Sequence, residues 1–529
     1  MEETMKKMLL VLVALSLSLP LWANGDGENA GDEERMQISF GYWQEELFGG
    51  AFDRENDLMI QAFEDKFGVE MVPKFVTWSD FNEKYKLWAA AGELPDFFAT
   101  DLDKRTYMDW IDQGVLRALP EDLSAYPEVE KTLTRSDTAH LAIDGRYYRI
   151  PRLHSVYPHV ATGMYVRKDW MENMGIEDPK DWDSFIAMVD RFVNDDPDGN
   201  GLDDTIGVLP RRSGYWSYLR HSFTPALWAT NWVEEGGRWI PAFYSEKTTE
   251  AVEAVGKMYA DGLLYKDFLL LKDFNVADEK FSFGNVGVIL SQGDPPRAQQ
   301  TKDAWDKANP DKPFNEYVKL LTTFPFESSD GQRYNINRPG YWANNYFRGD
   351  LSDEKMAKIL EMLNFLSTED GVDFWYRGFE GKEYTQDGDT YVDTRPMGED
   401  GEKMSIADLY PSSLFFGGMA YWGNDKVFFN EDEINYSRYD RDVVAMTREF
   451  GLIQDNDCIS YPTDMLISEM GNEYLASQGV SVNPREIMEA ALITENPREA
   501  WEQSLEKFRR DGLEEHIAKV NEMIAEKDL

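Results

Sequence analysis

An oxygen-rich loop near residue 200 has the side-chain spacing of a calcium-binding loop. Side-chain oxygens fall at its first, third, fifth and ninth positions and a backbone carbonyl at the seventh; these residues are Asp196, Asp198, Asn200, Asp204 and Leu202. Ca²⁺ prefers oxygen ligands, and Gly201 at the sixth position allows the sharp turn that such loops need. The twelfth position is Gly207 instead of glutamate, so water or a distant residue must complete the coordination. A plain acidic turn is the alternative, and we favour a structural Ca²⁺ site.

Aromatic and acidic residues at the ends of predicted strands form a second candidate site. Sugar rings present apolar C–H faces, so carbohydrate sites combine flat Trp and Tyr surfaces with polar groups that bind hydroxyls. In open α/β sheets, ligands bind beyond the carboxyl ends of the strands. The candidates that follow predicted strands in this way are Trp43, Trp78, Asp101, Asp103 and Asp294. For each single tryptophan, packing in the core is the alternative.

Strands that alternate with helices must position these residues. Residues 36–41 and 69–75 predict two strands, and residues 56–67 between them predict a helix. A strand-like run at 164–167 opens a second unit of this kind. The helix after it places six apolar residues on one face, and these are Trp182, Phe185, Ile186, Val189, Phe192 and Val193. This order predicts an α/β fold with parallel sheets.

Four segments and the C-terminal helices together carry a family resemblance. The segments are residues 90–96 (AAGELPD), 144–148 (DGRYY), 165–170 (YVRKDW) and 371–383 (GVDFWYRGFEGKE). Their order resembles that of the extracellular solute-binding proteins (family 1) of ABC importers, in the large oligosaccharide-binding branch. The resemblance implies a two-lobed type II periplasmic-binding-protein fold, with crossover strands at a hinge and sugar bound between the lobes. It also implies that Trp228 and Trp422 contact the ligand, and that the oxygen-rich loop holds calcium.

The same resemblance gives the expected domain boundaries. We expect a signal peptide at 1–23 and a disordered leader at 24–35. The first lobe would comprise 36–160 and 295–380, and the second would comprise 161–294 and 381–529, including the C-terminal helices. The implied partners are an oligosaccharide ligand and the membrane permease subunits of an importer, and we expect a monomer.

The N-terminus and the cysteine content indicate the compartment. Lys6 and Lys7 precede an apolar run of about fourteen residues, which is typical of a signal peptide cleaved near Ala23. The run is too short to span a bilayer comfortably. Cys458 is the only cysteine, and it lies far from the N-terminus, so no lipid-attachment cysteine follows the signal. We therefore expect a periplasmic or secreted protein.

Charge and motif searches exclude several classes of function. The net charge of the 529-residue chain is −44, which argues against binding nucleic acid or an anionic membrane surface. Phosphate-binding loops, nucleophile elbows and zinc-binding histidine pairs do not occur, so we expect no enzyme. The alternatives are a secreted carbohydrate-active enzyme and a sugar-sensing surface module. An anionic glycan would require cationic side chains in the cleft, for which Arg211, Arg212 and Lys104 are candidates.

Overall fold

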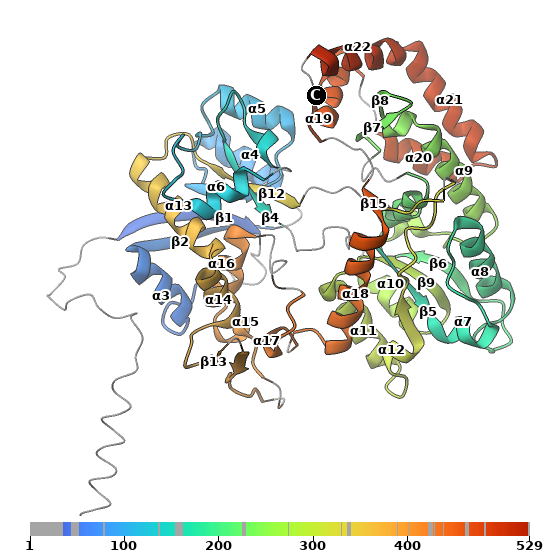
Figure 1. The fold of residues 1–529 in the computed structure, drawn as a ribbon, viewed down its shortest axis with the longest axis horizontal. Coiled ribbons are helices and arrows are strands. Elements are labelled where there is room, and N and C mark those ends of the chain that lie inside the picture. The colour runs from blue at the N-terminus through green and yellow to red at the C-terminus, as the bar shows by residue number, and fades with distance from the viewer. Residues whose placement is uncertain are drawn as a thin grey trace, which may run out of the picture.

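The computed structural model describes most of the chain after its N-terminal segment. The described residues are 35–43, 52–77, 80–135, 138–153, 162–224, 229–272, 274–329, 331–335, 340–388, 390–399, 401, 403–421, 427, 429–436, 438–460, 465–480 and 483–526. They form two lobes, each with its own sheet and its own hydrophobic core (Figure 1). The expected two-lobed α/β fold is therefore confirmed, but both sheets contain antiparallel strands, so the prediction of parallel sheets is wrong in part.

The first lobe contains a five-stranded sheet in the order β2-β1-β3-β12-β4. Its strands are β1 (Met36–Trp43), β2 (Val69–Val76), β3 (Phe97–Thr100), β4 (Arg149–Leu153) and β12 (Tyr341–Phe347). β1 runs parallel to β2 and β3, whereas β12 is antiparallel to β3 and β4. Its helices are α3 (Leu58–Phe67), α4 (Phe81–Ala91), α5 (Lys104–Asp112), α6 (Pro127–Leu133), α13 (Asp353–Ser367), α14 (Glu369–Arg377), α15 (Ile406–Leu409), α16 (Ser412–Ala420) and α17 (Glu433–Tyr436).

The second lobe contains a four-stranded sheet in the order β10-β5-β9-β6. Its strands are β5 (Gly163–Arg167), β6 (Ile206–Pro210), β9 (Val286–Ser291) and β10 (Val318–Leu320). Every residue of β5 and β9 is buried, as expected for strands covered on both faces. Its helices are α7 (Lys168–Met174), α8 (Trp182–Asn194), α9 (Glu246–Ala260), α10 (Phe274–Ser282), α11 (Pro295–Ala308), α12 (Phe314–Tyr317), α18 (Arg441–Asp457), α19 (Met465–Ser477), α20 (Pro484–Leu492), α21 (Pro497–Arg510) and α22 (Leu513–Glu526).

Shorter elements complete the fold. Three strand pairs lie outside the two main sheets: β7 (Trp232–Glu235) with β8 (Arg238–Pro241), β13 (Tyr384–Asp387) with β14 (Thr390–Asp393), and β11 (Tyr334–Asn335) with β15 (Ile459–Ser460). Short 3₁₀ helices span Ala139–Leu141, Ser213–Ser222, Ala242–Tyr244 and Phe268–Leu270. No helix among the described residues is long and apolar enough to span a bilayer.

The helix predicted to follow β5 forms as its sequence indicates. α8 begins at a capping box, in which Asp181 accepts a hydrogen bond from the backbone of Ser184 while the Ser184 side chain binds back to the cap residue. Phe185, Val189 and Phe192 are buried, and the other three predicted apolar residues pack against the same core. The acidic loop at 196–204 follows directly, so the helix fixes where that loop begins.

The chain changes lobes at positions that differ from the expected 295 and 380. α11 and β10 belong to the second lobe, because β10 pairs with β5 and its Val318 and Leu320 fill the second core. Residues 384–421 belong to the first lobe, because α16 packs Phe415 and Phe416 into the first core. The chain returns to the second lobe at α18. The places of these exchanges depend on long-range strand pairing, which no local pattern in the sequence encodes.

Candidate functional site

The carboxyl ends of the parallel strands in both lobes face the segments that connect the lobes. In the first lobe, β4 ends at Leu153, which pairs with Tyr341 at the start of β12. The chain then crosses to Gly163, which pairs with Ser291 at the carboxyl end of β9. Tyr421, where α16 has ended, forms a parallel bridge with Leu153 at the same edge. The two carboxyl edges therefore meet at the crossovers, where a ligand of such a fold binds.

A stacked pair of tryptophans lies at this edge of the first lobe. Trp342 stacks on Trp43 with ring centroids 5.5 Å apart and planes inclined by 29°. Trp43 ends β1 as predicted, but only 1% of it is exposed, whereas Trp342 is half-buried. The aromatic surface presented by this pair is therefore that of Trp342, and Trp43 supports it from behind.

A strained bulge sets the position of Trp342. The register between β12 and β4 shifts between Tyr341 and Asn344, and Ala343 within this bulge has a φ of 59°. A left-handed conformation costs a residue with a Cβ about 1–2 kcal/mol. Bulges re-aim side chains beside functional sites, and strain of this kind persists where the surroundings enforce it. Asn344 anchors the bulge from below, pairing with both Thr100 and Pro151.

Arg152 supports the aromatic pair from inside the first lobe. Its side chain is fully buried, and its guanidinium lies 4.9 Å from the ring of Tyr42 and 5.3 Å from that of Trp43. It donates to the hydroxyl of Tyr42 at 3.2 Å and to the carbonyl of Tyr421 at 2.8 Å. Arg152 thus joins β1, β4 and the segment after α16, and it holds the tryptophan pair in place.

Acidic residues follow β3 at the same edge, and they have different roles. Asp101 is exposed to solvent, yet desolvation by the surrounding protein raises its pKa, and the positive charge of Arg149 partly opposes that shift. Asp103 caps α5 by accepting from the backbone of Thr106 at 2.8 Å. Although burial raises the pKa of Asp103, hydrogen bonds from Thr106 bring it below its ordinary value. Asp101 therefore has its carboxylate free of a capping role, whereas Asp103 does not.

The second lobe contributes a polar and aromatic edge after β9 and β6. The side-chain oxygen of Gln292 accepts from the Tyr215 hydroxyl at 3.3 Å and from Arg297 Nε at 3.2 Å. Tyr215 stacks on Tyr218 with centroids 4.6 Å apart. Asp294 caps α11 by accepting from the backbone of Arg297 at 3.0 Å. This edge therefore presents a tyrosine pair, a carboxamide and a guanidinium.

The three candidate cations differ in burial and in their contacts. Arg211 is fully buried and forms an ion pair with Asp278, whose side chain is 3% exposed. Lys104 binds Glu473 of the second lobe at 2.9 Å. Arg212 is exposed. Burial within the protein removes Arg211 as a contact for an anionic ligand.

Sequence reasoning missed several residues of this edge. Trp78, Trp228 and Trp422 lie outside the described residues, so their predicted contacts stay predictions. Candidate residues were taken from positions directly after predicted strands, and neither Trp342 nor Tyr215 occupies such a position. Only the antiparallel pairing of β12 with β3 brings Trp342 to the carboxyl edge, and no local pattern announces that pairing.

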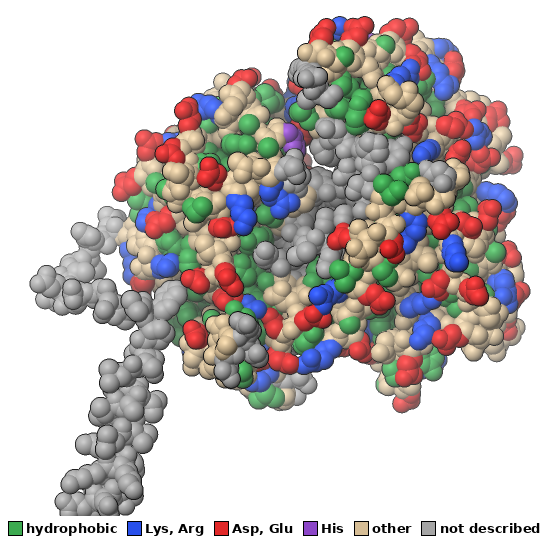
Figure 2. All heavy atoms as spheres, in the orientation of Figure 1, with side chains coloured by type: hydrophobic (Ala, Val, Ile, Leu, Met, Phe, Trp, Pro, Cys, Tyr) green, Lys and Arg blue, Asp and Glu red, His purple; other side chains and the backbone are tan. Residues whose placement is uncertain are grey.

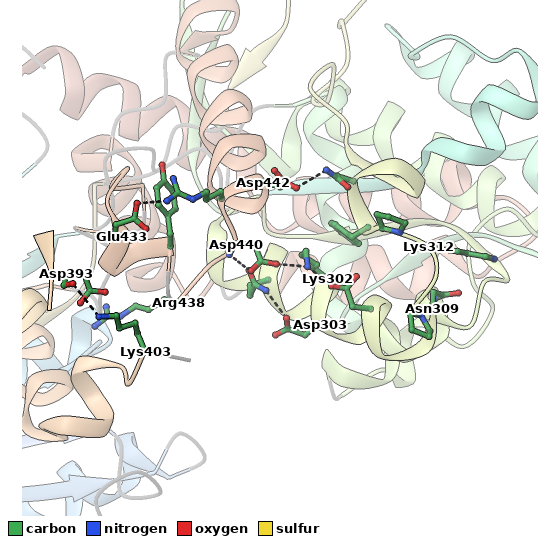
Figure 3. A pocket seen from close by; sticks show the side chains of 18 of the residues that line it. Lys302, Asp303, Asn309, Lys312, Asp393, Lys403, Glu433, Arg438, Asp440 and Asp442 are labelled. Atoms are coloured by element: carbon green, nitrogen blue, oxygen red, sulfur yellow. Dashed lines mark hydrogen bonds and ion pairs between the residues drawn. The ribbon is translucent and has the colours of Figure 1, made fainter. Parts of the chain in front are cut away.

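A separate cavity of about 1530 Å³ lies beside the crossover segment that leads into α18 (Figure 3). It is lined by residues of α11, β14, α17 and α18. Lys302 binds both Asp306 and Asp440 at 2.5 Å, and Arg441 binds Glu433. These charged groups are paired with one another. The residues of α11 that line the cavity lie beyond the first turn of that helix, whereas Asp294 at the carboxyl edge precedes the helix. We therefore separate this cavity from the site at the carboxyl edges.

The acidic loop gathers its predicted ligands around one side chain. The backbone N–H of Asn200 donates to Asp196 and Asp198 at 3.1 and 3.2 Å, and its amide group donates to Asp198 and Asp204 at 3.0 and 3.2 Å. Burial and the neighbouring carboxylates of Asp196 and Asp204 raise the pKa of Asp198, although a hydrogen bond from the Asn200 backbone opposes this. Among the residues the structure describes, no three His, Cys, Asp or Glu side chains are arranged to hold a metal.

The twelfth position of this loop cannot supply a ligand. Gly207 lies inside β6, and a Cβ there would come within 2.5 Å of the Leu263 carbonyl and 2.6 Å of Val189. The absence of the usual glutamate is therefore enforced by packing between β6 and α8. The remaining donors are all hard oxygens, which suit Ca²⁺.

Comparison with known proteins assigns the family. The model of the bacterial extracellular solute-binding proteins matches residues 53–372, which is more than half of the chain. This chain belongs to that family. The chain is similar to the lipoprotein LipO of Bacillus subtilis, at 27% identity over 47% of the chain and 49% of the relative. It is also similar to the fructooligosaccharide ABC transporter substrate-binding protein FusA of Streptococcus pneumoniae, at 31% identity over 29% of the chain and 30% of FusA.

Solved structures of solute-binding proteins share the fold. FusA in complex with kestose superposes with a TM-score of 0.65 at 18% identity, covering 93% of this chain and 99% of that one. An EF-hand mutant of FusA bound to fructo-nystose has a TM-score of 0.64 with the same coverage and identity. Sequence alignments, by contrast, span at most about half the length of the curated relatives described above. At this identity, the structural likeness shows the fold alone.

Proposed function

We propose that this solute-binding protein is exported, captures an oligosaccharide between its lobes and delivers it to the permease subunits of an ABC importer. Family membership and the two-lobed fold support this role. The relative named for fructooligosaccharide transport, FusA, and its structure with kestose support the class of ligand. The protein would bind its ligand without a chemical reaction. Ligand contacts with both lobes would favour the closed arrangement. The signal-like N-terminus supports export.

The aromatic pair at the carboxyl edge is the observation that carries this proposal. The face of Trp342 would stack on the apolar face of a sugar ring, and the Tyr215–Tyr218 pair would serve a second ring from the other lobe. Asp101 and Gln292 would bind hydroxyl groups, which need both donors and acceptors. Rigid backing by Trp43 and Arg152 lowers the cost of ordering the platform on binding.

We also propose that the acidic loop holds a structural Ca²⁺. Three carboxylates already lie around Asn200, and one of the similar solved structures is an EF-hand mutant of FusA. To bind the ion, the Asn200 side chain would have to turn its oxygen inward from the backbone of Leu202, which it now accepts from at 2.6 Å. The ion would offset the repulsion between three carboxylates and fix the connection from α8 to β6.

Thermal unfolding against a panel of neutral and anionic oligosaccharides tests the proposed function. A ligand that binds only the folded state raises the transition temperature by mass action, so a rise with one sugar class names that class. Trp342→Ala should remove the rise. Trp88→Ala should keep it, because α4 begins just after the carboxyl end of β2 and Trp88 lies in the last turn of that helix, away from this edge. Consumption of the glycan during the assay would instead establish an enzyme, and no response to any sugar would contradict the proposal.

A further inference from the structure

Helix α19 is fixed to the second lobe by its contacts with Trp232. The backbone N–H of Trp232 donates to the Ser468 hydroxyl at 2.8 Å, and its indole N–H donates to the Asn472 side chain at 3.1 Å. A Cβ at Gly471 would lie 2.3 Å from the Trp232 ring, so only glycine lets the ring rest directly on the helix. This face of α19 therefore packs tightly against the second lobe, and the packing fixes the direction in which the rest of the helix surface points.

A neighbouring face of α19 presents two carboxylates to the first lobe. Glu469 and Glu473 are four residues apart, so they lie on the same side of the helix, one turn from each other. Glu473 binds the Nζ of Lys104, the first residue of α5, at 2.9 Å across 369 residues of sequence. Figure 1 shows α19 beside α5 at the top of the molecule, far from α17 at the bottom.

Arg149 of β4 brings a second cation to this contact. Its guanidinium lies 4.6 Å from the ring centre of Tyr107, which is one turn along α5 from Lys104. Burial lowers the pKa of Arg149, but the surrounding tyrosines and the carboxylate of Glu469 raise it above its ordinary value. Glu469 also acts on Tyr107, whose pKa is raised chiefly by burial. The two cations and the two carboxylates thus come from different lobes.

We infer that this contact is an electrostatic latch: the acidic face of α19 holds the cation-bearing rim of the first lobe and stabilises the closed arrangement of the lobes. Lys104 lies four residues beyond the end of β3, so the latch is at the rim of the carboxyl edge and can act on closure. The attraction within the latch acts against the general electrostatic repulsion in this acidic molecule. The net charge is −44, and Figure 2 shows acidic side chains over both lobes, which repel one another.

The latch depends on lobe motion, which belongs to the proposed function, but its test requires no ligand. Small-angle X-ray scattering gives the radius of gyration of the sugar-free protein, which grows when the lobes separate. Four proteins would be compared: the wild type, Lys104→Glu, the charge exchange Lys104→Glu with Glu473→Lys, and Lys519→Glu. The last is the matched control, because it makes the same charge change in a pair with Glu522 that lies within α22.

At 10 mM salt, where the screening length is about 30 Å, we expect a larger radius for Lys104→Glu than for the control. The charge exchange should restore the wild-type radius. At 1 M salt, where the screening length is about 3 Å, the four radii should agree. Salt also screens the general repulsion between the lobes, so the salt response of the wild-type radius does not by itself test the latch. The test is the difference in radius between Lys104→Glu and Lys519→Glu.

Binding provides a second measurement once a sugar is known. Exposed ion pairs contribute up to about 1 kcal/mol, so Lys104→Glu should weaken binding at low salt by about two- to fivefold relative to the control. Equal radii for Lys104→Glu and the control at 10 mM salt, or a charge exchange as expanded as the single variant, would overturn the latch. Failure to find any sugar would overturn the proposed function and leave the scattering result decisive for the latch.

Discussion

Replacing Trp342 with alanine should weaken ligand binding while leaving the protein folded. Trp342 is half-buried, and its contacts include a stack on Trp43 at 5.5 Å between centroids. Losing the stack costs about 0.5–1.5 kcal/mol of folding free energy, in addition to the loss of buried apolar area. A central aromatic contact in a binding site contributes about 2 kcal/mol or more, so the dissociation constant should rise by at least about thirtyfold.

Trp43, the other ring of this stack, should contribute to folding more than to ligand binding. It is 1% exposed, so Trp43→Ala should cost about 3–5 kcal/mol of folding free energy, as deletion of a buried aromatic does. Trp342→Phe keeps a flat ring and should recover most of the affinity. Urea unfolding measures the folding term, and isothermal titration calorimetry with the sugar found in the thermal screen measures the binding term. If Trp342→Ala binds within twofold of the wild type, Trp342 is not the platform.

Three further perturbations have expected outcomes that follow from the described contacts. Chelation of Ca²⁺ should lower the unfolding temperature reversibly. Asp198→Ala should abolish that response, and Asp203→Ala, which lies outside the ligand spacing, should retain it. A wild type whose unfolding temperature does not respond to the chelator would contradict the metal site. Burial holds the pKa of His221 well below its ordinary value near 6.5, so the unfolded chain binds more protons than the folded chain below that pH. The free energy of unfolding should therefore fall on acidification below pH 6.5 by up to about 1.4 kcal/mol per pH unit. Calorimetry should find this slope reduced in His221→Gln. Arg211→Met leaves the carboxylate of Asp278 buried, so urea unfolding should show a loss of about 3–5 kcal/mol, and a loss below 1 kcal/mol would refute the importance of the pair.

The sequence predicted local elements well, because their determinants are local. The apolar face of α8 and its end in the acidic loop follow from spacing alone. The predicted strands at 36–41 and 69–75 form as the longer β1 and β2.

The candidate site was less predictable, because it depends on pairing between distant segments. Trp43 was correctly placed at a strand end, but the residues that bury it include Arg152 and Trp342, which are about 110 and 300 residues later in the chain. Asp103 and Asp294 also follow strands, yet both cap helices there, as residues between a strand and a helix commonly do. The domain boundaries failed for the same reason, since β10 and α16 join their lobes through contacts that no local pattern encodes.

The most direct test of the central claim is a crystal structure of the protein with the oligosaccharide that gives the largest rise in unfolding temperature. The proposed function predicts a sugar ring stacked on Trp342 between the two carboxyl edges, with Tyr215 of the other lobe within contact distance. A sugar bound instead in the charged cavity beside Lys302 and Asp440, with the face of Trp342 unoccupied, would contradict the account.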